Sequence, residues 1–246
     1  SIMTNKYMYF IANWKMFGDL TTLNKLTKVI KFVSKYKKKK LKLIYSPPAT
    51  LIFVLSKIFK NTSIDISAQN CHQSIKHGPH TGQINSKMLR DAGARYVILG
   101  HSENRQLGEN DKLINLKIDS AIKNGLKVIF CIGETLKEKK KNITKKILAK
   151  QISHGLNKIS KKKNILIAYE PVWAIGSGKI PNQLELYETI KFIKSKIKGA
   201  KVLYGGSVNL KNINLLKKID NIDGFLVGGA SQNSKNFIDI IKKTFI

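Results

Sequence analysis

The sequence predicts an α/β fold, a (β/α)8 barrel built as a single domain over residues 1–246. Short apolar runs rich in β-branched residues alternate with amphipathic runs of helical period, which is typical of parallel strands buried on both faces. Eight such units fit the 246 residues, and no run rich in Pro, Gly or Ser divides the chain. These three observations favour a closed barrel over an open doubly wound sheet.

Eight apolar runs carry the strand pattern. In chain order they cover residues 7–12, 41–45, 63–68, 95–99, 126–131, 164–169, 201–204 and 223–227. Between them, residues 182–198 show apolar side chains at i, i+4, i+7 and i+11 from Leu186, with lysines on the opposite face. Pro181 and Asn182 are typical of the start of that helix. Similar stripes predict a helix within residues 143–156 and a last helix over 234–245.

The net charge of +30 is carried almost entirely by lysine, since arginine occurs only at 90, 95 and 105. Bidentate recognition of phosphates and bases favours arginine, and these lysines are spread over many segments. Lys, Ile and Asn are all abundant and share A/T-rich codons, so we favour biased genome composition over selected nucleic-acid binding. A positive field would still steer anionic substrates toward the protein.

Cysteine usage and hydropathy place the protein in the cytoplasm. Cys71 and Cys131 form no disulfide framework, which indicates a reducing compartment. No apolar run approaches the roughly 20 residues of a membrane span, and the first run is too short for a secretory signal. Ser1 and Ile2 precede Met3, and we interpret them as foreign to the native chain.

Polar or glycine-rich residues follow five of the eight predicted strands, at the rim where such barrels place their functional residues. These residues are Asn13-Trp14-Lys15, Gly100-His101-Ser102-Glu103, Glu170, Gly205-Gly206-Ser207 and Gly228-Gly229-Ala230-Ser231. Independent surface positions would not cluster at one rim in this way. The sequence therefore predicts a functional site there.

Glu170 directly follows the sixth apolar run, and the segment after it is built like a hinged lid. Pro171 fixes one end, Trp173 supplies an apolar body, and Gly176 and Gly178 allow positive φ at the other end. Burial raises the pKa of a carboxyl group and makes it a better base near neutral pH, while a closing lid excludes water. We interpret Glu170 as a catalytic base rather than as the partner of a surface lysine.

Two more rim residues are candidates for chemistry. His101 precedes a predicted helical turn, and a helix N-terminus disfavours a protonated imidazole, so the neutral ring would donate a hydrogen bond to a carbonyl oxygen. A purely structural histidine is the alternative, and the position at the rim favours the catalytic role. Lys15 follows the first strand, where its head would enter the barrel mouth, and Asn13 would orient it.

The glycine pairs after the last two strands predict a phosphate cradle. Small residues let backbone N–H groups approach an anion, and the usual phosphate site of this barrel lies after strands seven and eight. Ser207, Gly228 and Gly229 are the expected contacts, and Gly176 would add another when the lid closes.

Cys71, His72, His77 and His80 raise the alternative of a zinc site. Their spacing matches no standard zinc pattern, and nearby glycine and proline residues favour a long protruding loop. We therefore predict no metal and no cofactor.

These residues resemble the triosephosphate isomerase family over essentially the whole chain. The matching motifs, in the family's order, are Ala12-Asn-Trp-Lys-Met16, Thr81-Gly82, Gly100-His-Ser-Glu103, Cys131-Ile-Gly-Glu134, residues 168–179, Tyr204-Gly-Gly-Ser-Val208 and Gly224-Phe-Leu-Val-Gly-Gly-Ala-Ser231. The resemblance implies the TIM barrel fold. It also implies interconversion of dihydroxyacetone phosphate and glyceraldehyde 3-phosphate in glycolysis and gluconeogenesis, without a cofactor.

Roles for individual residues follow from the resemblance. Glu170 would move a proton between two carbons, and the pairing of this carboxylate with a neutral histidine, here His101, is a known feature of the family. Lys15, with Asn13 nearby, would stabilise the enediolate. Backbone groups of Gly176, Gly228 and Gly229, with Ser207, would bind the phosphate. Glu103 and Cys131 would support the catalytic residues.

The resemblance further implies a homodimer, in which a loop around residues 70–83, with Thr81 near its tip, inserts beside Asn13 and Lys15 of the second copy. The family commonly has Glu after the Thr-Gly pair and Arg after the Ser-Glu pair, where this chain has Gln83 and Asn104. Both ends of an ionic contact between subunits are therefore replaced. We expect a neutral amide contact and an interface that is less sensitive to salt.

Three alternatives to this function stay open from the sequence. They are a different isomerase or lyase on a phosphate-binding barrel, a basic nucleic-acid-binding protein, and an inactive relative. The complete set of Asn13, Lys15, His101 and Glu170 argues against the first and the third. Steep salt dependence of DNA binding would support the second.

Overall fold

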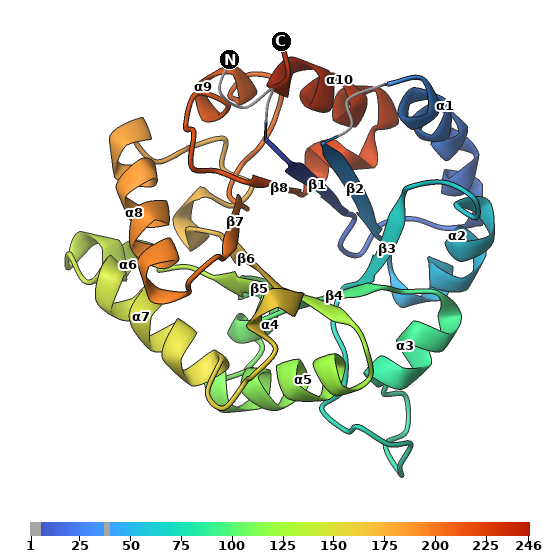
Figure 1. The fold of residues 1–246 in the computed structure, drawn as a ribbon, viewed down its shortest axis with the longest axis horizontal. Helices are drawn as coiled ribbons and strands as arrows, with labels where there is room; N and C mark the ends of the chain where they lie inside the picture. Colours follow the sequence, from blue (N-terminus) through green and yellow to red (C-terminus); the bar gives the residue numbers. More distant parts are fainter. Residues whose placement is uncertain (1–5, 37–39) are drawn as a thin grey trace.

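The computed structural model describes residues 6–36 and 40–246, and within them eight strands close into a parallel barrel in sequence order (Figure 1). The strands are β1 (Met8–Asn13), β2 (Leu41–Ser46), β3 (Asp65–Ala68), β4 (Tyr96–Leu99), β5 (Lys127–Ile132), β6 (Ile165–Tyr169), β7 (Lys201–Tyr204) and β8 (Gly224–Val227). Each predicted strand is present, with both ends within two residues of the predicted positions. The (β/α)8 barrel is therefore confirmed. Ser1, Ile2 and lysines 37–39 lie outside the described residues.

Helices surround the barrel on all sides in Figure 1. They are α1 (Thr27–Lys35), α2 (Ile52–Ile58), α3 (Ser86–Ala92), α4 (Ser102–Gln106), α5 (Asp111–Lys123), α6 (Leu136–Lys140), α7 (Thr144–Gly155), α8 (Gln183–Lys196), α9 (Ile213–Leu216) and α10 (Ser234–Thr244). The three helices predicted from apolar stripes correspond to α7, α8 and α10. Asn182 caps α8 by accepting the backbone N–H groups of Leu184 and Glu185, which confirms the predicted start.

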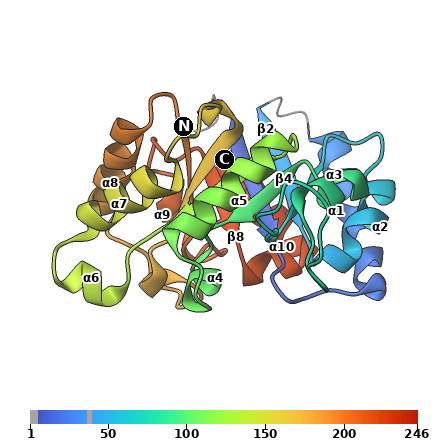
Figure 2. The ribbon, with the colours of Figure 1, turned by 90° about the horizontal axis from the view of Figure 1, so that it is seen from below.

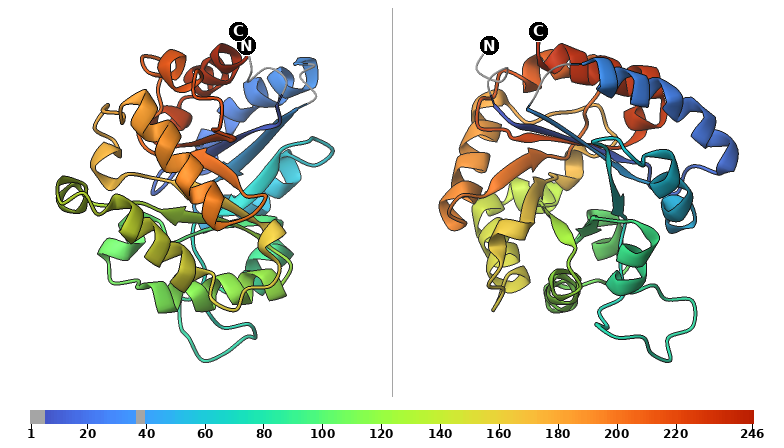
Figure 3. Two further views of the ribbon diagram at one scale, coloured as in Figure 1. Left: turned by 60° about the vertical axis from the view of Figure 1, so that its left-hand side comes forward. Right: turned by 45° about the vertical axis from the view of Figure 1, so that its right-hand side comes forward.

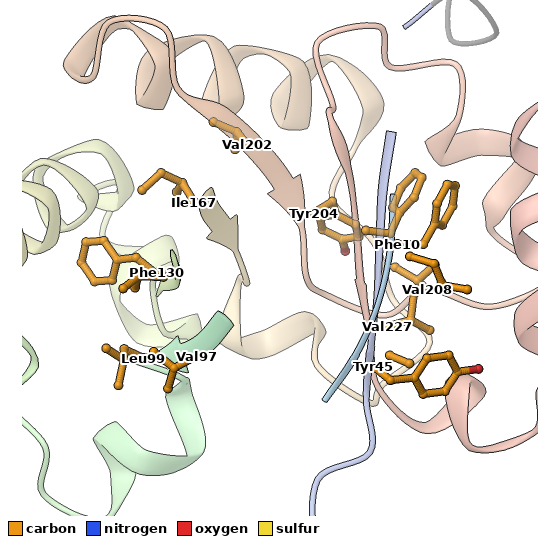
Figure 4. Packing of buried hydrophobic residues seen from close by; sticks show 14 of the residues in the cluster. Phe10, Tyr45, Val97, Leu99, Phe130, Ile167, Val202, Tyr204, Val208 and Val227 are labelled. Carbon is orange, nitrogen blue, oxygen red and sulfur yellow. The ribbon is translucent and has the colours of Figure 1, made fainter. Parts of the chain in front are cut away.

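Successive strand residues alternate between two apolar layers. Val97, Leu99 and Phe130 lie in the outer layer between strands and helices, part of which is drawn in Figure 4. Their chain neighbours Ile98 and Ile129 belong to a smaller cluster on the opposite face of the strands, inside the barrel. Burying one such large side chain contributes about 1.5–3 kcal/mol. Because side chains fill the interior, a ligand site has room only at an end of the barrel.

Loops at one end of the barrel carry the short helices α4 and α6, as the side view in Figure 2 shows. The loop between β3 and α3 projects from the body of the protein in Figure 3, which confirms the protruding loop predicted around Cys71. In the part of the chain that the structure describes, no helix has the length and apolar character needed to cross a membrane.

Candidate active site

The carboxyl ends of the strands surround a cavity of about 180 Å³. Its lining includes Asn13, Lys15, His101, Gly176, Ser207, Gly228 and Gly229, all of which are predicted site residues. These residues come from the ends of β1, β4, β7 and β8 and from the segment after β6, so the barrel brings together positions far apart in the sequence. Glu170 does not line this cavity but lies directly behind His101.

Glu170 is only 1 % exposed, and its carboxylate is held against the start of α4. The backbone N–H of Ser102 donates to Oε1 at 2.7 Å, and Nε2 of His101 lies 3.1 Å from Oε2. Burial raises the pKa of this carboxyl to about 8, although the hydrogen bond from Ser102 and the charges of Arg105 and Lys15 lower it. The group is therefore a base of near-neutral strength, and it must turn toward the cavity to reach a ligand.

Gly133 explains how the segment after β5 approaches the backbone of Glu170 so closely. A Cβ atom at residue 133 would lie 1.8 Å from the carbonyl oxygen of Glu170, a distance that no other residue type can accommodate. The backbone N–H of Glu170 donates to Ile132 at 2.8 Å, which fixes the same junction. Local sequence at the end of β5 thus positions the candidate base at the end of β6.

His101 is neutral in this structure, as the sequence predicts. It occupies the cap position of α4, and its Nδ1 accepts the backbone N–H of Glu103 at 3.1 Å, so the ring proton lies on Nε2. Burial lowers the pKa of the imidazole to about 4, and this effect outweighs the nearby charge of Glu103. The Nε2–H group is therefore available as a hydrogen-bond donor at the cavity wall.

Lys15 reaches the cavity from the end of β1 with a left-handed backbone, φ 55°. Its Nζ lies 2.8 Å from Oε1 of Glu103, and its backbone N–H donates to Oδ1 of Asn13 at 3.0 Å, so Asn13 contacts the turn that carries the lysine. Gln69 holds the same turn, because its Nε2 donates to the carbonyl oxygens of Lys15 and Ser46 at 2.9 Å. The sequence analysis missed Gln69, since a lone amide after a strand carries no recognisable signal.

Arg105 is a second residue that the sequence analysis missed. Its guanidinium donates to the carbonyl oxygens of Gly100 and Cys131, at 2.7 and 3.1 Å, and pairs with Asp111 at 2.7 Å. These contacts join the ends of β4 and β5 behind Glu170. Cys131 is fully buried in the barrel interior, and burial together with the charge of Glu170 raises the pKa of its thiol, which keeps it neutral.

Backbone and small side chains form the opposite side of the cavity. A Cβ atom at Gly229 or Gly176 would meet nothing within 4 Å, so packing against the protein does not demand glycine there. The absence of side chains at these two glycines keeps the cavity open and leaves their backbone N–H groups accessible to a ligand. Such a surface suits an anion bound by backbone donors.

The lid is docked on Ser207. The Ser207 hydroxyl accepts the backbone N–H of Gly178 at 3.0 Å and donates to the carbonyl oxygen of Ala174 at 2.5 Å. Gly176 and Gly178 have φ angles of 64° and 76°, as predicted for the flexible end of the lid. Residues 174–178 are therefore connected to the end of β7 by hydrogen bonds that can break and form again.

The zinc alternative has no support in the described residues, where no group of three or more His, Cys, Asp or Glu side chains is placed to hold a metal. His72 and His80 stack on each other in the protruding loop, with ring centroids 4.4 Å apart. Thr81 and Gln83 lie exposed on the same loop, and Asn104 is half-buried on α4.

Comparison with known proteins gives one consistent result. The family model of triosephosphate isomerase matches residues 8–244. The chain is 40 % identical to the triosephosphate isomerase of Thermodesulfovibrio yellowstonii over 244 residues, covering 95 % of this chain and 98 % of the relative. It is 39 % identical to that of Geotalea uraniireducens, covering 94 % and 96 % of the two chains.

Among solved structures, the triosephosphate isomerase of Bartonella henselae superimposes with a TM-score of 0.87 at 33 % identity, over 96 % of this chain and 98 % of that one. Fold, site geometry and sequence thus agree, and this chain belongs to the triosephosphate isomerase family.

Proposed function

We propose that this chain interconverts dihydroxyacetone phosphate and D-glyceraldehyde 3-phosphate through an enediolate, as a step of glycolysis and gluconeogenesis. The observation that carries the proposal is the pairing of a neutral His101 with a buried carboxylate of raised pKa, beside a cavity lined by glycine backbone. A proton transfer next to a carbonyl needs a base near neutral pKa and a donor that is not itself strongly acidic. His101 lines the cavity, and Glu170 lies directly behind it.

In the proposed mechanism Glu170 turns from Ser102 into the cavity and removes a proton from the carbon next to the substrate carbonyl. The Nε2–H group of His101 donates to the carbonyl oxygen as negative charge develops there, and Lys15 stabilises the enediolate by its charge. His101 gives its Nε2 proton to the oxyanion and takes up the proton of the hydroxyl on the adjacent carbon, so the proton moves from one oxygen to the other. Protonated Glu170 returns its proton to the neighbouring carbon, which completes the isomerisation without any cofactor.

We assign the phosphate to the glycine side of the cavity. The backbone N–H groups of Gly176, Gly228 and Gly229 and the hydroxyl of Ser207 are the proposed donors, and the lid covers the bound group. Excluding water at this point protects the enediolate from losing its phosphate. Glu103 supports the arrangement, because it contacts Lys15 through its carboxylate and His101 through its backbone N–H.

We also propose a cytoplasmic homodimer. Met16 is 100 % exposed, and Leu20 and Phe17 are also largely exposed beside it, which is unusual for apolar side chains at a free surface. They lie next to the mouth and near the protruding loop that carries Thr81 and Gln83. A second copy covering this region would bury them and bring Thr81 close to Asn13 and Lys15. Cytoplasmic placement is supported by Cys71 and Cys131, both of which are free.

A coupled assay of triose phosphate interconversion tests the function with Glu170→Asp. The shorter side chain moves the carboxylate by about 1 Å, which is expected to cost on the order of 100-fold in turnover. Glu188→Asp is the matched control, since Glu188 is exposed on α8 and should keep full activity. An inactive wild-type enzyme would refute the proposed activity, and equal activity of wild type and Glu170→Asp would refute the base.

A further inference from the structure

Trp173 is the largest side chain of the lid and lies in its first turn, three residues after Glu170. Its indole N–H is buried and acts on the carboxylate of Glu134, whose pKa it lowers, although within the described residues it has no partner at ordinary hydrogen-bond geometry. The ring instead faces a cation, because Nζ of Lys139 lies 4.4 Å from the ring centroid. An ammonium over an indole face is attracted by the negative face of the ring.

Lys139 makes a second contact on the far side of the lid. Its Nζ lies 2.6 Å from Oε1 of Glu185, in the first turn of α8. The α8 helix begins where the lid segment ends, whereas Lys139 belongs to α6, which follows β5. One side chain therefore contacts both the first turn of the lid and the helix into which the lid leads.

The helix that carries Lys139 is itself fixed in place. Thr135 and Glu138 form a reciprocal capping box at its start, with hydrogen bonds of 2.9 and 3.2 Å. The backbone N–H of Lys139 donates to Thr135 at 2.9 Å, so the lysine emerges from the first hydrogen-bonded turn. The capped turn fixes the backbone from which the lysine side chain extends, and the ion pair with Glu185 fixes its ammonium.

Glu134 interacts with the indole and links this contact to the strand that carries the base. It is buried, and its two carboxylate oxygens share the single hydroxyl proton of Tyr169, with oxygen–oxygen distances of 2.5 and 3.0 Å. It precedes the capping box by one residue. Burial raises the pKa of Glu134, while Tyr169, Trp173 and Lys139 each lower it. The docked indole thus sits between a buried carboxylate and the ammonium of Lys139.

We propose that Lys139 is a positioning residue that holds Trp173, and with it the lid, in the docked arrangement seen here. Glu185 keeps the ammonium of Lys139 over the indole ring. The expected change in kinetics rests on the proposed function, whereas the expected change in the environment of Trp173 does not. Lys139 touches no substrate atom. It acts by favouring the docked lid, in which Gly176 and Ser207 complete the phosphate site.

The structural consequence can be measured by 19F NMR on protein labelled with 5-fluorotryptophan. The chain has two tryptophans, and Trp14 is buried in the core, so its resonance serves as an internal reference. Wild type, Lys139→Gln, Lys139→Arg and Lys140→Gln are compared with and without inorganic phosphate. Lys140 is the matched control because it is exposed on the same helix and, within the described residues, has no ion pair or ring contact.

In Lys139→Gln we expect the Trp173 resonance to shift and broaden while that of Trp14 stays in place. We also expect phosphate to bind about three- to fivefold more weakly, the size of effect that one partly exposed cation–π contact produces. Lys139→Arg should have a Trp173 resonance and a phosphate affinity close to those of the wild type, since it keeps the cation. Glu185→Gln should shift the resonance and weaken phosphate binding less than Lys139→Gln does. Lys140→Gln should match wild type.

Kinetics separate this inference from the proposed function. The coupled assay follows conversion of dihydroxyacetone phosphate into glyceraldehyde 3-phosphate by the wild type and by Lys139→Gln. The variant should raise KM about three- to fivefold with little change in kcat, because Lys139 does not contact the reacting atoms. Absence of isomerase activity in the wild type would refute the proposed function and leave the NMR result standing. An unchanged Trp173 resonance and unchanged phosphate affinity in Lys139→Gln would overturn the role of Lys139.

Discussion

Two buried carboxylates stand at opposite ends of the barrel and differ in their partners. Asp223 directly precedes β8, is 2 % exposed, and pairs with Lys194 at 2.9 Å and Lys6 at 3.2 Å. It also accepts the backbone N–H of Val202 at 2.8 Å. Glu170 follows β6 at the other end, is equally buried, and has a neutral histidine beside it instead of a lysine or arginine.

The difference separates a carboxylate that stabilises the fold from one that is available for reaction. Two lysine ammonium groups and the backbone N–H of Val202 contact the carboxylate of Asp223, which thereby joins the starts of β7 and β8. Burial without a paired cation disfavours the charged form of Glu170 and raises its pKa to about 8. Burying this carboxylate disfavours its charged form at neutral pH, and this is the property that the proposed base needs.

The largest expected effect comes from exchanging each carboxylate for its amide. Glu170→Gln should lower kcat on the order of 10³-fold, because the base is lost. It should also stabilise the protein at pH 8 by up to about 4 kcal/mol, because folding raises the pKa of Glu170 from 4.5 to about 8. Asp223→Asn should leave kcat/KM near wild type and destabilise the protein by about 2–4 kcal/mol, since two lysines lose their partner. Coupled assays and urea unfolding measure both effects.

The pH dependence of unfolding sharpens the same comparison. The pKa of Glu170 is higher in the folded protein than in the unfolded chain, so the folded state binds more protons between its ordinary pKa of 4.5 and about 8. The free energy of unfolding should therefore carry a component that falls as pH rises through this window. Glu170→Gln should remove that component. If wild type and Glu170→Gln showed parallel pH profiles, the raised pKa would be contradicted.

A smaller effect is expected on the glycine side of the cavity, where binding depends on backbone groups and one hydroxyl. Ser207→Ala removes the acceptor for Gly178 and the donor to Ala174, and should raise KM about tenfold, the equivalent of one or two modest hydrogen bonds. Ser177→Ala is the control, because within the described residues the hydroxyl of that lid serine bonds only to the backbone N–H of Lys179, two residues on. Similar KM values for the two variants would show that Ser207 does not hold the lid.

The two sides of the cavity also differ in how well the sequence predicts them. Strands, helix stripes and the glycine pairs depend on local patterns, and the structure places them where expected. Glu170, His101 and Lys15 were found because each follows an apolar strand. Their mutual geometry could not be predicted, since the turn of Glu170 toward Ser102 depends on contacts between segments 68 residues apart.

Residues that act only through others escaped the sequence analysis for the same reason. Gln69 and Arg105 hold turns together by donating to carbonyl oxygens of distant strands, and an isolated amide or guanidinium has no period or motif that would mark it. Lys139 is even harder to recognise from the sequence, because it is one lysine in a run of several. Such residues become recognisable only when coordinates show which carbonyl, ring or carboxylate they face.

The smallest effect concerns the proposed contact between two copies of the chain, where Gln83 and Asn104 replace charged residues of the family. A neutral amide contact has no net charge to screen, so the dissociation constant of the wild-type dimer should change less than about twofold between 0.05 and 0.5 M NaCl. The double variant Gln83→Glu, Asn104→Arg should form an ionic contact and weaken several-fold over the same range, as an exposed ion pair does. Analytical ultracentrifugation measures both constants.

The two single variants test whether residues 83 and 104 meet across the interface. Either single variant leaves one unpaired charge and should dimerise more weakly than the double variant. Additive effects of the two single changes would show that the two residues do not meet.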